Sequence, residues 1–402
     1  MASAPLLKFN GTTCSWQNQG FKGASPPRNM KDLAGKTVEI PSFRHDVSEI
    51  PREILSGFGH GKGRLIEGVY EKIILILMDG LGYKNLADRK LLGKMGLQTQ
   101  ELGSAIPSST PSILTTILTG LKPAEHGILG FQFPLPGHGI FRPVDFTDPF
   151  GFAYEVSPEE VMPYPTLFDR LQEFGIHSEH HISFSFASEP FTEMITGSGR
   201  LVPFVNHGQV FRNLQKFLSK KGRGFSFVYF PTPDDLLHSS RCKIAYQTEL
   251  ALKLRLVEKL KASRNADKTL VVLASDHGHV GIQYRPVKVR PSWFRQENMG
   301  GSRHIMISPK AKYYEKIIRA YSRFGYVFDG QELLDSGLMG KQVWSESRER
   351  MTDLFFLADS ELVPYVSEHQ AYCSAHGGVH IDEMSAFFGT SRLSSFEPKL
   401  EF

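Results

Sequence analysis

The stretch EKIILILMDG (residues 71–80) decides the fold. It is a short, continuous run of apolar side chains that ends in Asp-Gly, which is typical of a strand buried on both faces of a parallel sheet. Similar stretches along the chain are 176–183, 225–230, 269–275 and a further candidate at 304–308. Helical patterns lie between them at 111–119, 165–174 and 243–262.

Strands that alternate with helices predict an α/β fold, in which a doubly wound, mostly parallel sheet is flanked by helices. Residues 1–70 show little periodicity and are predicted to form an N-terminal extension that packs on or leads into the core. Residues 71–402 are predicted to form a single domain. Two segments, 131–164 and 278–375, fit the alternation poorly. Because loops of that length are usually lids or caps, we predict cap insertions there.

The composition excludes several classes of protein. Hydrophobic residues make up 41% of the chain and charged residues 22%, which is the balance of a globular protein and not of a disordered one. A net charge of +4 over 402 residues is too small to predict binding to a nucleic-acid polymer or a membrane surface. The longest clean apolar run, Ile73–Met78, is far shorter than the roughly 18 residues of a membrane span.

Three widely spaced cysteines, Cys14, Cys242 and Cys373, argue against a disulfide scaffold and fit a reducing compartment. The N-terminal sequence has no basic region followed by an apolar run, so no signal peptide is predicted. We therefore expect a cytoplasmic protein. Its oligomeric state is not predicted.

Acidic residues stand where three of the predicted strands end. Asp79 ends the first strand, Asp276 ends another, and Asp234 lies just past a third. In open α/β sheets, ligands bind beyond the carboxyl ends of the strands. His238 follows Asp234 by four residues, which places both on one face of a helical turn, and His277 is adjacent to Asp276. Carboxylates and imidazoles are ligands that Zn²⁺ accepts and Mn²⁺ tolerates.

A hydroxyl stands at the start of a predicted helix in IPSSTPSILTTILTG (106–120), at Thr110. Backbone N–H groups and the helix dipole favour an anion at such a place. From its position alone, Thr110 is either the N-cap of the helix or a nucleophile.

Together these motifs resemble the alkaline phosphatase superfamily, specifically its type I phosphodiesterase/nucleotide pyrophosphatase branch. The motifs that recur in the chain order of that family are LILMDGLG (75–82), Pro107–Thr110 running to Thr119-Gly120, Pro123 with His126-Gly127-Ile128, YFPTPDDLLH (229–238), Ser275–Gly278 and HGGVHIDEM (376–384). The resemblance covers roughly 71–131, 161–183, 225–280 and 374–385. It implies an alkaline-phosphatase-like fold with a single catalytic domain over residues 71–402.

The resemblance also implies two divalent metal ions, with Zn²⁺ favoured and Mn²⁺ as the alternative. One would be bound by Asp234, His238 and His376, and the other by Asp79, Asp276, His277 and the oxygen of Thr110. The implied activity is hydrolysis of phosphodiester or nucleotide pyrophosphate bonds in small molecules. Thr110 would attack phosphorus, and water would then hydrolyse the phosphothreonine.

Several alternatives remain open. Asp235 competes with Asp234, His279 with His277, and His380 with His376, and in each case the family motif favours the second residue of the pair. The same metal core would serve a phosphomonoesterase or a phosphonate hydrolase. A rival of another class is a non-catalytic protein that binds a phosphate ligand.

Two groups of side chains carry alternative interpretations outside the motifs. Seven rings either cover the sheet or line a substrate pocket, namely Phe131, Phe133, Phe141, Phe146, Phe150, Phe152 and Tyr154. His180 and His181 fall in a predicted strand and are interpreted as structural.

Overall fold

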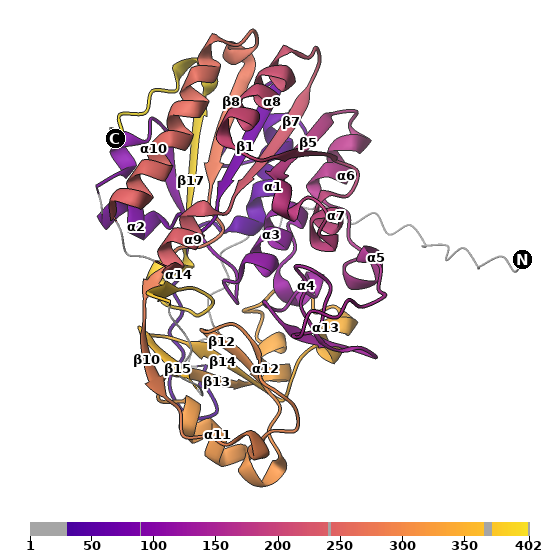
Figure 1. The fold of residues 1–402 in the computed structure, drawn as a ribbon, viewed down its shortest axis with the longest axis vertical. Coiled ribbons are helices and arrows are strands. Elements are labelled where there is room, and N and C mark those ends of the chain that lie inside the picture. The colour runs from indigo at the N-terminus through magenta and orange to yellow at the C-terminus, as the bar shows by residue number, and fades with distance from the viewer. Residues whose placement is uncertain (1–29, 89, 240–242, 366–371, 401–402) are drawn as a thin grey trace, which may run out of the picture.

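The computed structural model describes residues 30–88, 90–239, 243–365 and 372–400. A seven-stranded sheet lies at its centre, in the order β2-β17-β8-β1-β7-β5-β6 (Figure 1). These strands are β1 (Lys72–Met78), β2 (Gln98–Gly103), β5 (His177–Ser183), β6 (Arg200–Phe204), β7 (Gly224–Phe230), β8 (Thr269–Ala274) and β17 (Ser385–Arg392). Five neighbouring strands, from β8 to β6, pair in parallel, whereas β17 runs antiparallel to both of its neighbours. The predicted α/β fold with a mostly parallel sheet is confirmed.

Alternate side chains of β1 enter two separate cores, one on each face of the sheet. Leu75 and Leu77 join one core, whereas Ile74 and Ile76 join the other. The first core contains side chains of α1 (Ile50–Gly57), α3 (Thr110–Thr119), α6 (Leu167–Glu173) and α7 (Pro190–Thr196). The second contains side chains of α2 (Tyr83–Asp88), α8 (His207–Ser219) and α10 (Lys243–Lys259). The continuous apolar runs in the sequence therefore reflect strands covered on both faces.

The helix α3 has clear start and stop signals. Pro111 lies in its first turn, where a missing backbone N–H costs nothing, and Gly120 ends it with a φ of 79°, a left-handed conformation that suits glycine. These signals place Thr110 at the first position of the helix, facing the carboxyl edge of the sheet. None of the helices in the described part of the chain is both long and apolar enough to cross a membrane.

Residues from the predicted cap segment 278–375 build a second, antiparallel sheet in the order β11-β12-β14-β13 (Figure 1). Its strands are β11 (Met299–Gly300), β12 (His304–Ile307), β13 (Gly325–Asp329) and β14 (Leu354–Ala358), and its helices are α11 (Tyr314–Tyr321) and α12 (Gly330–Asp335). The candidate strand at 304–308 is thus real but belongs to this sheet. The division of the chain into an extension and one catalytic domain stays a prediction.

Shorter elements outside the two larger sheets complete the fold. They are β3 (Phe133–Leu135), β4 (Gly139–Phe141), β9 (Val280–Gly281), β10 (Gln283–Pro286), β15 (Leu362–Tyr365), β16 (Ser374–Ala375), α4 (Pro123–His126), α5 (Pro158–Val161), α9 (Thr232–Ser239), α13 (Ser345–Glu349) and α14 (Ile381–Met384). A fully buried ion pair joins Arg303, directly before β12, to Glu383 of α14, with Nη2 2.6 Å from Oε1. Glu383 also accepts hydrogen bonds from the backbone N–H groups of Gly378 and His380, so it fixes the loop that follows His376.

Candidate metal centre

Three acidic side chains lie together at the carboxyl edge of the central sheet. Asp79 follows β1, Asp276 follows β8, and Asp234 lies in α9 directly after β7. They meet because β7, β1 and β8 are neighbours in the sheet. Asp79 and Asp276 are buried, and the side chain of Asp234 is only 14% exposed. Carboxylates buried this close together are strongly disfavoured unless a positive charge compensates them.

The first cluster consists of Asp79, Asp276 and His277, whose ligand atoms all lie within 4.8 Å of one another. The Nε2 atom of His277 is 3.4 Å from Oδ1 of Asp79 and 3.2 Å from Oδ2 of Asp276. The hydroxyl oxygen of Thr110 is 3.3 Å from the same Nε2. The structure thus brings together the four residues that the sequence assigned to one metal ion.

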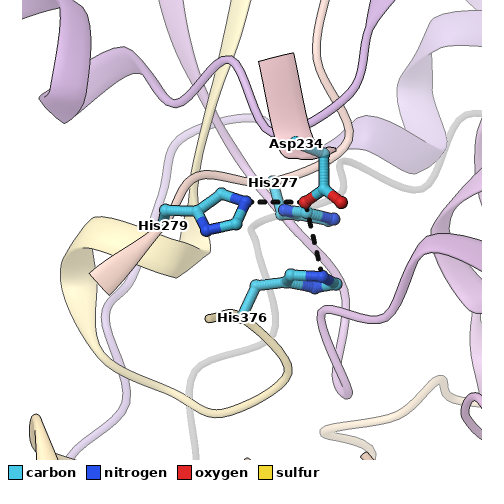
Figure 2. A group of neighbouring side chains, drawn as sticks. All are labelled: Asp234, His277, His279 and His376. Carbon is cyan, nitrogen blue, oxygen red and sulfur yellow. Dashed lines mark hydrogen bonds and ion pairs between the residues drawn. The ribbon is translucent and has the colours of Figure 1, made fainter. Parts of the chain in front are cut away.

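The second cluster surrounds Asp234. Its Oδ1 atom is 2.6 Å from Nε2 of His279 and 3.5 Å from Nε2 of His376, and its Oδ2 atom is 3.4 Å from Nε2 of His238. Figure 2 shows the imidazoles of His279 and His376 directed at the carboxylate, with His277 beside them. His277 stacks on His376 with ring centroids 3.6 Å apart, so the two clusters are contiguous.

Backbone carbonyls determine which nitrogen of His238 and of His376 carries the proton. The Nδ1 atom of His238 is 2.9 Å from the carbonyl oxygen of Ser374, and that of His376 is 2.7 Å from the carbonyl oxygen of Ser108. A carbonyl oxygen can only accept, so each Nδ1 donates. In a neutral ring, Nε2 is then unprotonated and presents its lone pair to Asp234.

The same reasoning applies to His277 and His279. The Nδ1 atom of His277 donates to the carbonyl oxygen of Gly278 at 3.1 Å. The Nδ1 atom of His279 is 3.1 Å from the hydroxyl of Ser374, whose proton is already donated to the carbonyl oxygen of Leu237 at 2.6 Å. His279 therefore also donates through Nδ1 and leaves Nε2 as the atom that faces Asp234.

One oxygen of Asp79 and one of Asp276 also lack a hydrogen-bond donor among the described residues. These atoms, Oδ1 of Asp79 and Oδ2 of Asp276, are both buried. Acceptors that face acceptors are satisfied by a cation between them, and a set of imidazole nitrogens and carboxylate oxygens suits Zn²⁺ and also suits Mn²⁺. The residues of both clusters therefore fit divalent metal ions.

The electrostatics of the clusters agree with this fit. Burial, reinforced by the charges of Asp276 and Asp234, raises the pKa of Asp79 well above its ordinary value. Burial also acts to raise the pKa of Asp234, but its interactions with His279 and His376 outweigh that effect and lower it. Burial and the neighbouring His277 hold the pKa of His376 well below its ordinary value, which keeps the ring neutral and able to bind a metal ion.

Thr110 is not the N-cap of its helix. Ser109, with extended backbone angles, occupies the cap position, and Thr110 is the first helical residue. The cap interpretation is therefore wrong. The hydroxyl of Thr110 is free of helix-capping duty and lies against His277 of the first cluster.

The structure separates the competing candidates. His380 caps α14, where its Nδ1 accepts from the backbone N–H of Asp382, and it stays outside both clusters. Asp235 is exposed and belongs to neither cluster. His279 is not an alternative to His277, because both lie in the site: His277 adjoins both clusters, whereas His279 belongs to the cluster around Asp234. The sequence analysis missed this, although residues two apart project to the same side wherever a segment is extended.

All seven predicted site residues thus lie in or beside the two clusters, together with His279. Their assignment as metal ligands and nucleophile stays a prediction.

A cavity of about 190 Å³ opens beside Thr110, between α3, α7 and the strands β5 and β7. Of the seven rings considered in the segment 131–164, Phe131 lines this cavity. Phe133, Phe141 and Phe146 are buried in the core, and Phe150 and Phe152 are exposed. No lysine or arginine is among the described residues that line the cavity.

Comparisons with known proteins give a family and a fold. The chain matches the type I phosphodiesterase/nucleotide pyrophosphatase family over residues 73–335. None of the curated proteins matches it.

Among solved structures, murine and human ectonucleotide pyrophosphatase/phosphodiesterase 5 resemble the chain at 14% and 16% identity, each with a TM-score of 0.62 over 79% of this chain and 87% of the other. An inactive Thr-to-Ala variant of the murine protein has been solved with AMP. Phosphonoacetate hydrolase from Sinorhizobium meliloti, in complex with phosphonoformate, resembles the chain at 15% identity with a TM-score of 0.57, over 79% of this chain and 89% of the other. At these identities the likeness shows a shared fold.

Proposed function

The chain belongs to the type I phosphodiesterase/nucleotide pyrophosphatase family, and we propose on that premise that it is a hydrolase with two divalent metal ions, which cleaves phosphodiester or nucleotide pyrophosphate bonds of small molecules through a covalent intermediate on Thr110. The family consists of phosphoric ester hydrolases. The metal stoichiometry, the nucleophile and the preferred bond are the parts that we add.

The arrangement of Thr110 is the observation that carries the proposal. Its hydroxyl oxygen lies 3.3 Å from Nε2 of His277, beside the buried carboxylates of Asp79 and Asp276. A hydroxyl beside a divalent metal ion loses its proton more easily, so it needs no separate catalytic base. The inactive Thr-to-Ala variant of the murine relative supports a threonine nucleophile in this fold.

The charges favour a diester. Two divalent cations bring four positive charges, and the carboxylates of Asp79, Asp234 and Asp276 bring three negative ones. The remaining positive charge matches the alkoxide of Thr110, and no lysine or arginine lines the adjacent cavity in the described residues. A phosphodiester carries one negative charge and a phosphomonoester about two, so the diester meets less uncompensated charge.

The residues of the two clusters then have distinct roles. Asp79, Asp276, His277 and Thr110 hold one metal ion, and Asp234, His238, His279 and His376 hold the other. When bound, the metal ions supply Lewis-acid stabilisation of negative charge.

The oxygen of Thr110 attacks phosphorus in line with the departing ester oxygen, and water then hydrolyses the phosphothreonine. The backbone N–H groups at the start of α3 favour the anionic phosphoryl group. The hydroxyl of Tyr229 donates to Asp79, and the N–H of Gly80 donates to Asp276, which holds both carboxylates in place.

Substitution of the nucleophile tests this function. Thr110→Ala is expected to lower kcat on bis(p-nitrophenyl) phosphate by roughly a thousandfold or more, because the covalent step is lost. Ser112→Ala is the matched control: it removes a buried hydroxyl from the same helix that has no hydrogen-bond partner, and it should leave turnover unchanged. Full turnover by Thr110→Ala would refute the covalent mechanism.

A substrate panel separates the rival functions. The wild-type protein would be assayed with p-nitrophenyl phosphate, a nucleoside triphosphate and phosphonoacetate beside the diester, before and after chelation. We expect the diester or the triphosphate to be preferred, and activity to return when Zn²⁺ is added back. Preference for the monoester or the phosphonate would replace the substrate assignment, and inactivity on the whole panel with metal bound would favour a binding protein.

A further inference from the structure

The cavity beside Thr110 continues past the metal centre into an apolar space. Beyond Thr110 its walls are formed mainly by aliphatic and aromatic side chains of α3, α7, β5 and β7, including Leu114, Ile182, Phe191 and Phe227. Its volume of about 190 Å³ leaves room for a small organic group. The polar side chains in this part of the lining are few, and each has an assignable hydrogen-bonding state.

His180 is a buried polar residue of this lining. Its ring is fully buried, and its Nδ1 atom is 2.7 Å from the hydroxyl oxygen of Thr196. That hydroxyl is in turn 2.5 Å from the carbonyl oxygen of Thr192. Two oxygens that close need a proton between them, and the carbonyl has none, so Thr196 donates to Thr192.

The proton of Thr196 is therefore unavailable to His180. The Nδ1 atom of His180 must donate to the hydroxyl oxygen, which leaves Nε2 as the unprotonated nitrogen. Burial, together with the neighbouring His181, lowers the pKa of His180 to about 3, so the ring is neutral at physiological pH.

The lone pair on Nε2 of His180 has no partner among the described residues. The atom is buried, and no hydrogen-bond donor of the described residues reaches it. The rings of Phe168 and Phe227 pack against the imidazole, with centroids 5.7 Å and 4.9 Å away, and offer no N–H or O–H group. A buried acceptor without a donor is unfavourable, and a donor on a molecule in the cavity would relieve it.

Toward the solvent, the polar groups of the lining are the carboxylates of Glu189 and Asp235. Thr192 also lines the cavity, but it donates its hydroxyl proton to the carbonyl oxygen of Phe186 at 2.7 Å. The polar atoms of the lining outside the metal centre are therefore acceptors, which disfavours an anionic group in this space.

We propose that this cavity binds one organic group of the phosphoester substrate, and that it selects an apolar group without negative charge whose hydroxyl or amine donates a hydrogen bond to Nε2 of His180. This inference rests on the proposed function and narrows its substrate class. His180, interpreted from the sequence as structural, becomes a specificity residue. Thr196 becomes the residue that keeps the imidazole proton of His180 on Nδ1.

The test uses diesters that share a p-nitrophenyl leaving group and differ in the second group: phenyl, the hydroxyphenyl and aminophenyl isomers, and carboxyphenyl. We expect kcat/KM of the wild type to be about tenfold higher for at least one hydroxyphenyl or aminophenyl isomer than for phenyl. The carboxyphenyl ester should be about tenfold poorer than phenyl, and Glu189→Gln combined with Asp235→Asn should reduce that penalty.

Two variants test whether His180 causes the preference for the donor-bearing ester. His180→Phe keeps a ring in the space but removes the acceptor, so the ratio of kcat/KM for the donor-bearing ester to kcat/KM for the phenyl ester should fall to about one. Thr196→Val removes the hydroxyl that accepts from Nδ1 of His180, so the proton is no longer fixed on Nδ1. The preference for the donor-bearing ester should weaken but remain. His177→Gln, on the same strand with a side chain that is 44% exposed, should keep the preference of the wild type.

A wild type without the preference, or a His180→Phe variant that turns over the phenyl ester and keeps the preference, would overturn the inference. If no diester is hydrolysed at all, the proposed function fails, and the cavity is tested separately. Calorimetry with Zn²⁺-loaded Thr110→Ala would compare phenylphosphonate with its hydroxyphenyl analogues. Tighter binding of a hydroxyphenyl analogue supports the inference, and equal affinities refute it.

Discussion

The contacts of Thr110 and His279 reveal roles in the site that their residue types alone do not predict. Thr110 has no capping role and lies against His277. His279 lies closer to the carboxylate of Asp234 than either His238 or His376 does. At the scale of single residues, the candidate metal site around Asp234 therefore includes one imidazole more than the family motif supplies.

Removal of the imidazole of His279 should weaken metal binding. His279→Phe keeps a ring but loses the Nε2 lone pair, so we expect the affinity of the Asp234 site for Zn²⁺ to fall by about 10–100-fold. Competition with a chromophoric chelator measures this. His380→Phe, which alters a histidine outside both clusters, is the control and should bind as the wild type does. Unchanged affinity of His279→Phe at both sites would show that His279 is not a ligand.

At the scale of elements, the turn after β1 holds the two clusters together. Gly80 has a φ of 71°, and a Cβ atom there would lie 2.9 Å from Nε2 of His279 and 3.1 Å from Cα of Asp234. The glycine therefore serves both the backbone conformation and the close approach of α9. A side chain at this position would displace Asp234 and His279, two proposed ligands from distant segments.

Gly80→Ala is expected to lower both stability and metal content. The left-handed conformation alone should lower the free energy of unfolding by about 1–2 kcal/mol. Gly35→Ala is the matched control, because Gly35 has a φ of 82° and a Cβ atom there would meet nothing within 4 Å, so this variant should lose stability but retain metal. Metal analysis after dialysis against limiting Zn²⁺ measures the difference. Equal metal content in the two variants would contradict the role assigned to Gly80.

The interior strands could be predicted from the sequence, and the edge strands could not. The strands β1, β7 and β8 are apolar throughout because both faces are covered, and this pattern is unambiguous. In contrast, β2 (QTQELG) is half exposed and polar, and β6 (RLVPF) contains a proline, so neither has a strand pattern. The antiparallel pairing of β17 depends on contacts far apart in the chain.

The site was more predictable than the fold around it. Asp79, Asp234 and Asp276 stand at the ends of three predictable strands, and adjacency in the sheet then brings them together. The role of His180 was not predictable, because it depends on the hydrogen bond from Thr196 to Thr192 and on packing between β5 and α7. Those contacts have no pattern in the local sequence.

At the scale of the whole molecule, buried neutral histidines tie stability to pH. Burial lowers the pKa of His126, His180 and His304 to about 3 each, from an ordinary value of 6.5. The unfolded chain takes up protons at these groups below pH 6.5, whereas the folded protein does so only near pH 3. Stability should therefore be retained above pH 6.5 and fall as the pH drops from 6.5 toward 3.

Replacement of one of these histidines should flatten that dependence. Neither nitrogen of His304 has a hydrogen-bond partner in the described part of the chain, and its ring stacks on Phe355. His304→Phe therefore removes a titrating group and keeps an aromatic ring. Between pH 6 and pH 4, the slope of unfolding free energy against pH should decrease by up to about 1.4 kcal/mol per pH unit relative to the wild type. Urea unfolding at a series of pH values measures it. Parallel slopes would show that His304 is not held neutral by burial.

The central claim is that hydrolysis proceeds in two steps through Thr110. The stereochemical course at phosphorus tests it most directly, with a chiral phosphorothioate diester hydrolysed in ¹⁸O-labelled water. Each in-line displacement inverts the configuration, so two successive displacements predict net retention. Net inversion would mean that water attacks the substrate directly, and it would contradict a covalent intermediate on Thr110.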